Sequence, residues 1–263
     1  MSTGRAAPPG PLSGRTILVT RPRERAAELV EVLRARGATV LEAPAIRLEE
    51  APRGPLDRAI GAAAAGTYSW VVFTSPKTVE VWFARGGARP VARVAAVGDG
   101  TAEALRGGGV EPDLIPEAFT TAALGGSFPR GEGAVLLPRA DIAPPDLESA
   151  LEAKGWTPVR VTAYRTLVPR SHPAESRRAL EEGRVDAITF TSASTVKGFV
   201  RLAGVPEGPR IVCIGPVTAE AAHEAGFTVH AVAAPHTVAG LVAALEHALG
   251  GDAASRRPSS SAR

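Results

Sequence analysis

The chain carries the same series of short motifs twice, and this internal repeat is the feature that most limits its possible folds. The segment VVFTSPKTVEVW closely resembles ITFTSASTVKGF, and their central threonines, Thr74 and Thr191, are 117 positions apart. Motifs that agree in the same order along a chain indicate duplication. The sequence therefore predicts two similar halves, at about 15–130 and 131–249. The further motif pairs at spacings of 117 or 118 are 93–105 with 210–222, 119–124 with 236–241, and 17–22 with 135–140.

Short apolar strands alternate with amphipathic helices in both halves. TILVT and WVVFT are continuous apolar runs, which is typical of parallel strands covered on both faces. A helical pattern follows each of them, one ending at Gly37 and one beginning at Pro76. This alternation predicts an α/β protein with two similar lobes, each a parallel sheet flanked by helices in a flavodoxin- or Rossmann-like arrangement.

Two segments depart from this pattern, TVLEAPAIRLEE (39–50) and TPVRVTAYRTLVP (157–169). Both contain proline, and both interleave charged with apolar residues. We interpret them as exposed, extended strands that leave one sheet and connect the two lobes.

Composition restricts the functional classes. The 263 residues have a formal net charge of +3 and no lysine-rich or aromatic-interleaved basic run, so we expect no nucleic-acid partner. The sequence has no apolar run approaching the ~20 residues that a membrane-spanning helix needs. Its first residues also lack the apolar core of a secretory signal. We therefore expect a cytoplasmic protein with no membrane partner. The single Cys213 excludes an internal disulfide.

Hydroxyl side chains and glycines gather where the predicted strands end and helices begin. A helix N-terminus presents unpaired backbone N–H groups and a partial positive charge. Each residue alone is readily explained as a helix cap. Several such termini on one sheet edge favour an anion site, and their number points to a ligand with several negative charges. The candidates are Thr74, Ser75, Gly98, Thr101 and Thr120 in the first half, and Ser192, Ser194, Gly215, Thr218 and Thr237 in the second.

Three further polar residues are candidates for the same site. Arg21 and Arg139 follow the first strand of each half, where they would either clamp carboxylates or form surface ion pairs. Tyr164 lies in one of the predicted connecting strands. Such a tyrosine is usually structural, yet a phenol facing a cleft between lobes could donate a proton.

Other chemistries have weaker support. Gly98 and Gly100 follow a strand, but Glu103 replaces the third glycine of a dinucleotide fingerprint. The histidines lack metal-binding spacings, so we expect no metal and no cofactor. Cys213 falls within a predicted strand and is better explained as a buried residue than as a nucleophile.

The ordered set of motifs resembles the uroporphyrinogen-III synthase family over about 15–249. The motifs that carry the resemblance are TRP (20–22), FTSPKTV (73–79), AVGDGTAEAL (96–105), LPRAD (137–141), AYRT (163–166), FTSASTV (190–196) and IGPVTAEAA (214–222). The resemblance implies two α/β lobes joined by a two-stranded β-ladder formed by 39–50 and 157–169. It also implies that one lobe is discontinuous, with 15–42 and 169–250 in one lobe and 43–168 in the other. Residues 1–14 and 251–263 would be flexible tails.

The family's reaction follows as an expectation. Its substrate is hydroxymethylbilane, a linear tetrapyrrole with eight carboxylates. Loss of the ring-A hydroxyl as water is followed by attack from ring D, and a spiro intermediate recloses with ring D inverted to give uroporphyrinogen III. The family uses no cofactor, and we expect a monomer.

The resemblance also assigns roles to residues. Thr74, Ser75, Gly98, Thr101, Ser192, Ser194, Gly215 and Thr218 match cleft-lining positions, and Tyr164 matches the tyrosine proposed to assist departure of the hydroxyl. Lys77 stands where relatives often carry a small polar residue, and Pro138 stands where the other half has Thr20.

Two alternatives remain open at this point. A non-catalytic, two-lobed binding protein for a polyanionic small molecule would explain the repeat and the hydroxyls equally well, but it would give Tyr164 no task. A nucleotide-dependent transferase would require a phosphate-binding loop that the sequence lacks.

Overall fold

The computed structural model describes residues 10–250. Residues 1–9 and 251–263, which make up most of the predicted tails, lie outside the described residues. Residues 10–14, expected to belong to the flexible N-terminal tail, form a turn instead. The Leu12 side chain is fully buried, and its backbone N–H donates to the Arg36 carbonyl at 3.0 Å. The prediction of a tail was wrong for these five residues, because Leu12 is part of a hydrophobic core.

The described chain divides into two compact units. Unit 1 contains the chain up to Arg47 and the chain from Leu167 onward, and unit 2 contains Leu48–Thr166. The chain therefore passes from one unit to the other twice. Each unit is a parallel-dominated, five-stranded sheet with helices on both faces.

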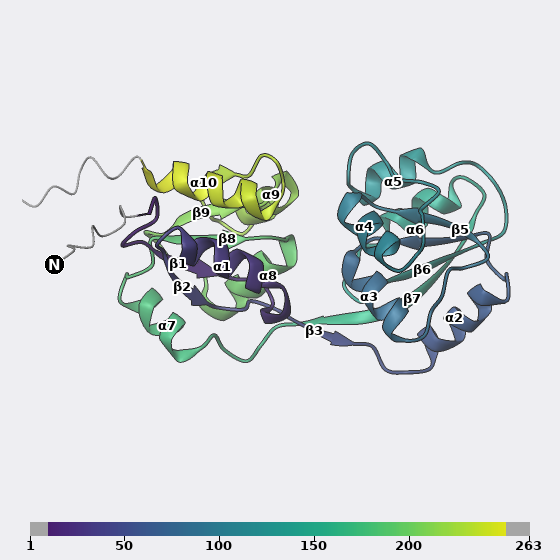
Figure 1. The fold of residues 1–263 in the computed structure, drawn as a ribbon, viewed down its shortest axis with the longest axis horizontal. Helices are drawn as coiled ribbons and strands as arrows, with labels where there is room; N and C mark the ends of the chain where they lie inside the picture. Colours follow the sequence, from purple (N-terminus) through teal and green to yellow (C-terminus); the bar gives the residue numbers. More distant parts are fainter. Residues whose placement is uncertain (1–9, 251–263) are drawn as a thin grey trace, which may run out of the picture. The chain divides into compact units, whose positions relative to one another are not determined.

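Unit 1 is built on a sheet with strand order β10-β9-β8-β1-β2. Every adjacent pair in it is parallel. In Figure 1 the purple strands β1 and β2, from the start of the chain, continue the sheet formed by the green strands β8 and β9. The strands are β1 (Thr16–Val19), β2 (Thr39–Glu42), β8 (Ala187–Phe190), β9 (Arg210–Cys213) and β10 (Val229–Val232).

Two hydrophobic cores cover the faces of this sheet. One contains alternate side chains of β1 together with those of α1 and α10. The other contains Leu18 with side chains of α7, α8 and α9. The alternation of Ile17 and Leu18 between the two cores explains why the strands read as unbroken apolar runs. The helices are η1 (Arg23–Arg25), α1 (Ala27–Ala35), α7 (Ala174–Glu181), α8 (Ala193–Ala203), α9 (Pro216–Glu224) and α10 (Val238–Gly250).

Unit 2 has strand order β3-β7-β6-β4-β5. The pairs β4–β5, β4–β6 and β6–β7 are parallel. One core joins this sheet to α2, α3 and α4, and a second joins it to α5 and α6. The elements are β3 (Arg47–Glu50), α2 (Pro55–Ala64), β4 (Trp70–Phe73), α3 (Pro76–Ala84), β5 (Arg93–Ala96), α4 (Asp99–Gly107), α5 (Thr121–Ser127), β6 (Ala134–Ala140), α6 (Asp146–Glu152) and β7 (Thr157–Leu167).

The duplicated halves exchange their first strands. In unit 1, β1 from the first half pairs with β8 from the second, with Ile17 opposite Ala187. In unit 2, β6 from the second half pairs with β4 from the first, with Val135 opposite Trp70. Ile17 and Val135 are equivalent positions of the repeat, 118 residues apart, and Trp70 and Ala187 are equivalent positions, 117 apart. The two strand pairs therefore have the same register. Each sheet is thus assembled from both halves.

One local expectation needs correction. Thr39–Glu42 was expected to connect the lobes, but it is the parallel edge strand β2 of unit 1, and its own residue Leu41 is buried. Only Arg47–Glu50, as β3, lies beside β7. The pattern of 39–42 misled because an edge strand alternates polar and apolar residues. After β1, residues Arg23–Arg25 form a 3₁₀ turn, and helix α1 begins at Ala27.

Candidate active site

Two helices of unit 2 begin directly after parallel strands, at the carboxyl edge of the sheet. Ser75 caps α3, and its Oγ accepts a hydrogen bond from the Thr78 backbone N–H at 3.2 Å. Gly98 is the N-cap of α4 and has extended backbone geometry. A Cβ at Gly98 would lie 2.8 Å from the Phe119 side chain. The absence of a side chain here allows Phe119 to pack against the turn.

Unit 1 repeats this arrangement. Ser192 caps α8 and accepts from the Thr195 backbone N–H at 3.2 Å. Gly215 is the N-cap of α9, also extended, and the His236 ring lies 3.5 Å from the position of a Cβ at Gly215. Each unit therefore places one serine-capped and one glycine-capped helix on the same sheet edge, with backbone N–H groups available for an anion.

The third pair of predicted caps is confirmed. Thr120 Oγ1 accepts from the Ala123 N–H, and Thr237 Oγ1 accepts from the Gly240 N–H, both at 3.1 Å. The helix capped by Thr120 is a short one, α5.

Thr101 and Thr218 lie in the first turns of α4 and α9, but neither is the cap. Their exposed fractions are only 3% and 5%, so these side chains face inward, and the N-cap glycines Gly98 and Gly215 are buried as well. Ser194 lies 2.9 Å from Ser192, measured between the Oγ atoms. Thr74 is half-buried between β4 and α3. The candidates thus share the same edge of their own sheet, unit by unit.

Tyr164 and Ser75 lie side by side in unit 2. Tyr164 is half-buried on β7, and its Oη is 3.3 Å from Ser75 Oγ, within hydrogen-bond distance. The strand order places β7 beside β6. A phenol therefore lies at the N-terminus of α3, where a partial positive charge and a hydroxyl cap coincide.

Arg21 and Arg139 occupy equivalent positions but have different surroundings. Arg139 is 1% exposed, and its Nη1 donates to the Pro144 carbonyl at 2.9 Å and to Glu148 Oε2 at 2.5 Å. Burial lowers the pKa of Arg139, and the Glu148 carboxylate opposes that effect. The expected choice between a substrate clamp and a surface ion pair did not include this outcome, a buried internal pair.

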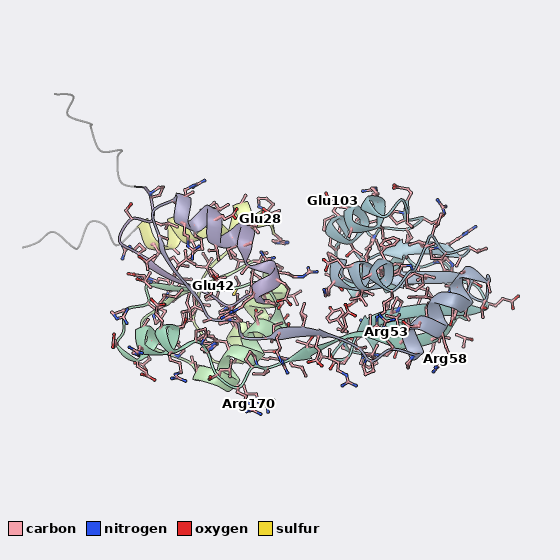
Figure 2. The ribbon with its side chains drawn as sticks, turned by 60° about the horizontal axis from the view of Figure 1, so that its bottom comes forward. Glu28, Glu42, Arg53, Arg58, Glu103 and Arg170 are labelled. Carbon is pink, nitrogen blue, oxygen red and sulfur yellow. The ribbon has the colours of Figure 1, made fainter. Side chains whose placement is uncertain are left out.

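Arg21 forms no hydrogen bond or ion pair with any other residue in the range 10–250. Its pKa is lowered by burial, and Glu28, labelled on α1 in Figure 2, opposes that shift. Its guanidinium is thus the more available of the two for a substrate carboxylate.

Groups suited to other chemistries are not assembled in the described part of the chain. Between residues 10 and 250, no three His, Cys, Asp or Glu side chains are arranged to hold a metal ion. Cys213 is buried in β9, and burial raises its thiol pKa to about 12, which disfavours the thiolate that a nucleophile requires. None of the helices within the same residues could cross a membrane.

Comparisons with known proteins identify the family. A family model described as uroporphyrinogen-III synthase HemD matches residues 27–243. The uroporphyrinogen-III synthase of Synechococcus elongatus is 32% identical over 90% of this chain and 96% of its own length. A putative uroporphyrinogen-III synthase of Methanothermobacter thermautotrophicus is 34% identical over 89% of this chain and 98% of its own. The chain belongs to the uroporphyrinogen-III synthase family.

The fold agrees with this assignment. A crystal structure of a mutant uroporphyrinogen III synthase from Thermus thermophilus superimposes with a TM-score of 0.69, at 22% identity, covering 90% of this chain and 99% of the other. The protein is therefore a member of an enzyme family of tetrapyrrole biosynthesis, with the two-sheet α/β fold of that family.

Two residues that shape the candidate site, Thr78 and Glu148, were not predicted from the sequence of this family member. Thr78 is fully buried, and its Oγ1 lies 2.9 Å from Ser75 Oγ. Its position three residues after the cap, in a motif repeated at Thr195, was the available signal. Glu148 has no comparable signal, because its importance depends on the burial of Arg139.

Proposed function

We propose that this protein catalyses the cyclisation of hydroxymethylbilane to uroporphyrinogen III, with Tyr164 as the proton donor for the departing hydroxyl. The Tyr164 proton would go to the ring-A hydroxyl oxygen as the carbon–oxygen bond breaks, which releases water. Ring D attacks the resulting azafulvene, and the spiro intermediate fragments and recloses with ring D inverted. The proton lost when the final pyrrole regains its aromaticity balances the one that Tyr164 donated.

The observation that carries the Tyr164 assignment is its position. It is the phenol on β7 that lies 3.3 Å from the cap of α3. A general acid must lie within reach of the atom it protonates. The carboxyl edge of a parallel α/β sheet is also where ligands of such folds bind.

The charge of the substrate supports the roles of the helix N-termini. One helix dipole contributes only about 0.3–1 kcal/mol to anion binding, so a single terminus is weak. Eight carboxylates can engage several termini at once. We assign the N-terminal N–H groups at Ser75 and Gly98 within unit 2, and those at Ser192 and Gly215 within unit 1, to carboxylate binding, each pair at the edge of its own sheet.

The remaining site residues fall into three groups. Arg21 is a direct carboxylate ligand, because its guanidinium forms no hydrogen bond or ion pair within residues 10–250 and interacts with Glu28 only through the longer-range electrostatic effect on its pKa. Thr74 and Ser194 hydrogen-bond at the edge around the carboxylates, whereas the buried Thr101 and Thr218 support the first turns of α4 and α9 from the interior. Arg139 acts indirectly, because its guanidinium is already bonded to Glu148 and Pro144.

We further propose that the enzyme works as a cytoplasmic monomer without nucleic-acid or membrane partners. Among the described residues, few large apolar side chains are exposed, and each unit has some of them. They are Val91, Phe119 and Ile142 in unit 2, and Val205, Val217 and Val232 in unit 1. Light scattering after size-exclusion chromatography would give a mass near 27.0 kDa for a monomer, and a stable multiple of it would contradict this proposal.

Product identity tests the proposed activity. Purified protein would be incubated with enzymatically generated hydroxymethylbilane, and the porphyrinogen isomer would be identified after oxidation. Spontaneous closure gives isomer I. We expect isomer III, whereas only isomer I, formed at the rate seen without protein, would support a non-catalytic binding protein instead.

A further inference from the structure

The two serine caps are equivalent in sequence, yet their hydroxyl groups have different partners. In unit 1, Ser192 Oγ lies 2.9 Å from Ser194 Oγ, so the cap hydroxyl is engaged by a residue two positions later. In unit 2 the position equivalent to Ser194 is Lys77. The Lys77 ammonium pairs with Glu80 at 3.3 Å.

This difference leaves the hydroxyl of Ser75 available for Tyr164. Ser75 Oγ lies 3.3 Å from Tyr164 Oη. Tyr164 corresponds to Ile46 of unit 1 at the repeat spacing of 118. The Ile46 side chain has no polar group with which a serine hydroxyl could form a hydrogen bond. Unit 2 therefore has both the Tyr164 phenol and, in Lys77, a residue that does not hydrogen-bond to the cap serine as Ser194 does in unit 1.

The direction of only one hydrogen bond at Ser75 is fixed by its atoms, the one from the Thr78 backbone N–H, and we assign the directions of the two hydroxyl contacts. A serine hydroxyl has one proton and two acceptor lone pairs. The Thr78 backbone N–H, at 3.2 Å, occupies one lone pair, and the fully buried Thr78 Oγ1, at 2.9 Å, faces the same oxygen. With Thr78 Oγ1 as a second donor, the Ser75 proton is directed to Tyr164 Oη. The proton of Tyr164 is then free to point toward a substrate.

We propose that Ser75 is a positioning residue that orients the Tyr164 hydroxyl, that Thr78 fixes the orientation of Ser75, and that Lys77 keeps Ser75 free of the local contact seen at Ser192. This inference rests on the proposed catalytic role of Tyr164. It replaces the assignment of the Ser75 side chain as a direct substrate ligand, while its backbone stays at the helix N-terminus.

A double-mutant cycle tests the proposal. Ser75→Ala is expected to lower kcat about two- to tenfold, the range for one hydrogen bond between neutral groups, with KM unchanged. In the Tyr164→Phe background the same substitution is expected to change kcat by less than about 1.5-fold, because its partner hydroxyl is already gone. Multiplicative effects of the two substitutions, or a raised KM for Ser75→Ala, would overturn the proposal.

The matched control is Thr120→Ala. It removes a threonine cap from the same unit that has no contact with Tyr164. Whatever its own effect on kcat, that effect is expected to multiply with the effect of Tyr164→Phe. Non-additivity here as well would show that the cycle reports general loosening of unit 2, and it would overturn the inference.

Two more variants keep the test decisive if Ser75→Ala folds poorly. Thr78→Val keeps the backbone donor and removes Oγ1, and it is expected to lower kcat in the same non-additive way. Lys77→Ser restores the competitor found in unit 1 and is expected to lower kcat about twofold or more. Full activity in both variants would overturn the proposal. A fully active Tyr164→Phe variant would instead refute the role of Tyr164 itself, and the two failures are thus distinguishable.

Discussion

Arg139 and Glu148 form a buried ion pair in unit 2, with Arg139 Nη1 only 2.5 Å from Glu148 Oε2. The pair ties the end of β6 to α6, and the second Glu148 oxygen, Oε1, lies 3.4 Å from Arg160 Nη1. The equivalent residue in the other half, Arg21, has no such pair within residues 10–250. The duplication has therefore given one arginine a structural contact and left the other available to a ligand.

The first prediction follows from this difference. Arg139→Gln is expected to reduce the free energy of unfolding by about 2 kcal/mol, since it removes the charged hydrogen bonds of a buried guanidinium to Glu148 and Pro144, while Arg160 still faces Glu148. Arg21→Gln is expected to change it by less than about 1 kcal/mol but to raise KM. Urea unfolding and steady-state kinetics of both variants would measure this. Equal stability losses would contradict the division of roles.

The second prediction concerns the glycine caps. Gly215→Ala is expected to leave the fold intact, because the backbone there is extended and the nearest side chain is at 3.5 Å. Its methyl group would crowd the N–H groups of α9 and raise KM about tenfold, the value of one hydrogen bond to a charged group. Gly98→Ala should do the same and also displace Phe119.

The control for the glycine caps is Gly61→Ala on α2, where no atom lies within 4 Å of an added Cβ. This change should slightly increase stability, since alanine favours a helix, without affecting KM. An unchanged KM for Gly215→Ala would show that the α9 terminus does not contact substrate.

The third prediction is a pH dependence of stability. His172 is 3% exposed beside Phe199, and burial lowers its pKa, with a smaller opposing contribution from the Pro44 carbonyl. Above the unfolded pKa of about 6.5, the ring is neutral in both states and stability is constant. As pH falls below that value, the unfolded chain gains a proton first, so stability decreases until the folded pKa is reached.

The expected slope for His172 is at most about 1.4 kcal/mol per pH unit. Urea unfolding between pH 8 and pH 5 would measure it. His172→Phe should reduce the slope, leaving the part due to His230, whose pKa is also lowered by burial and by Arg210. An unchanged slope in His172→Phe would contradict this account.

The sequence was sufficient for the parts of the site that depend on local chemistry. Ser75 and Ser192 could be predicted as caps because a serine between an apolar strand and a helix has few other roles. Gly98 and Gly215 were predicted to lie at helix N-termini, and they are the N-caps of α4 and α9.

The remaining features depend on packing between distant segments. Tyr164 and Ser75 are 89 positions apart, and their contact requires β7 and β4 to lie in one sheet. Burial of Arg139 depends on how α6 covers β6, which no pattern in LPRAD indicates. The exchange of first strands between halves is likewise a property of tertiary pairing, and here it was only the family resemblance that implied a discontinuous unit.

Replacement of Tyr164 by phenylalanine tests the central claim most directly, because it removes only the hydroxyl and phenylalanine suits a strand equally well. General acids typically contribute about 10²–10⁴ in rate, and expulsion by an electron-rich pyrrole places the expected loss near 10² or below. The measurement is the rate of porphyrinogen formation together with isomer identity in the folded variant. We predict a slower enzyme that still releases isomer III. A folded variant with full activity, or one that releases only isomer I, would contradict the account.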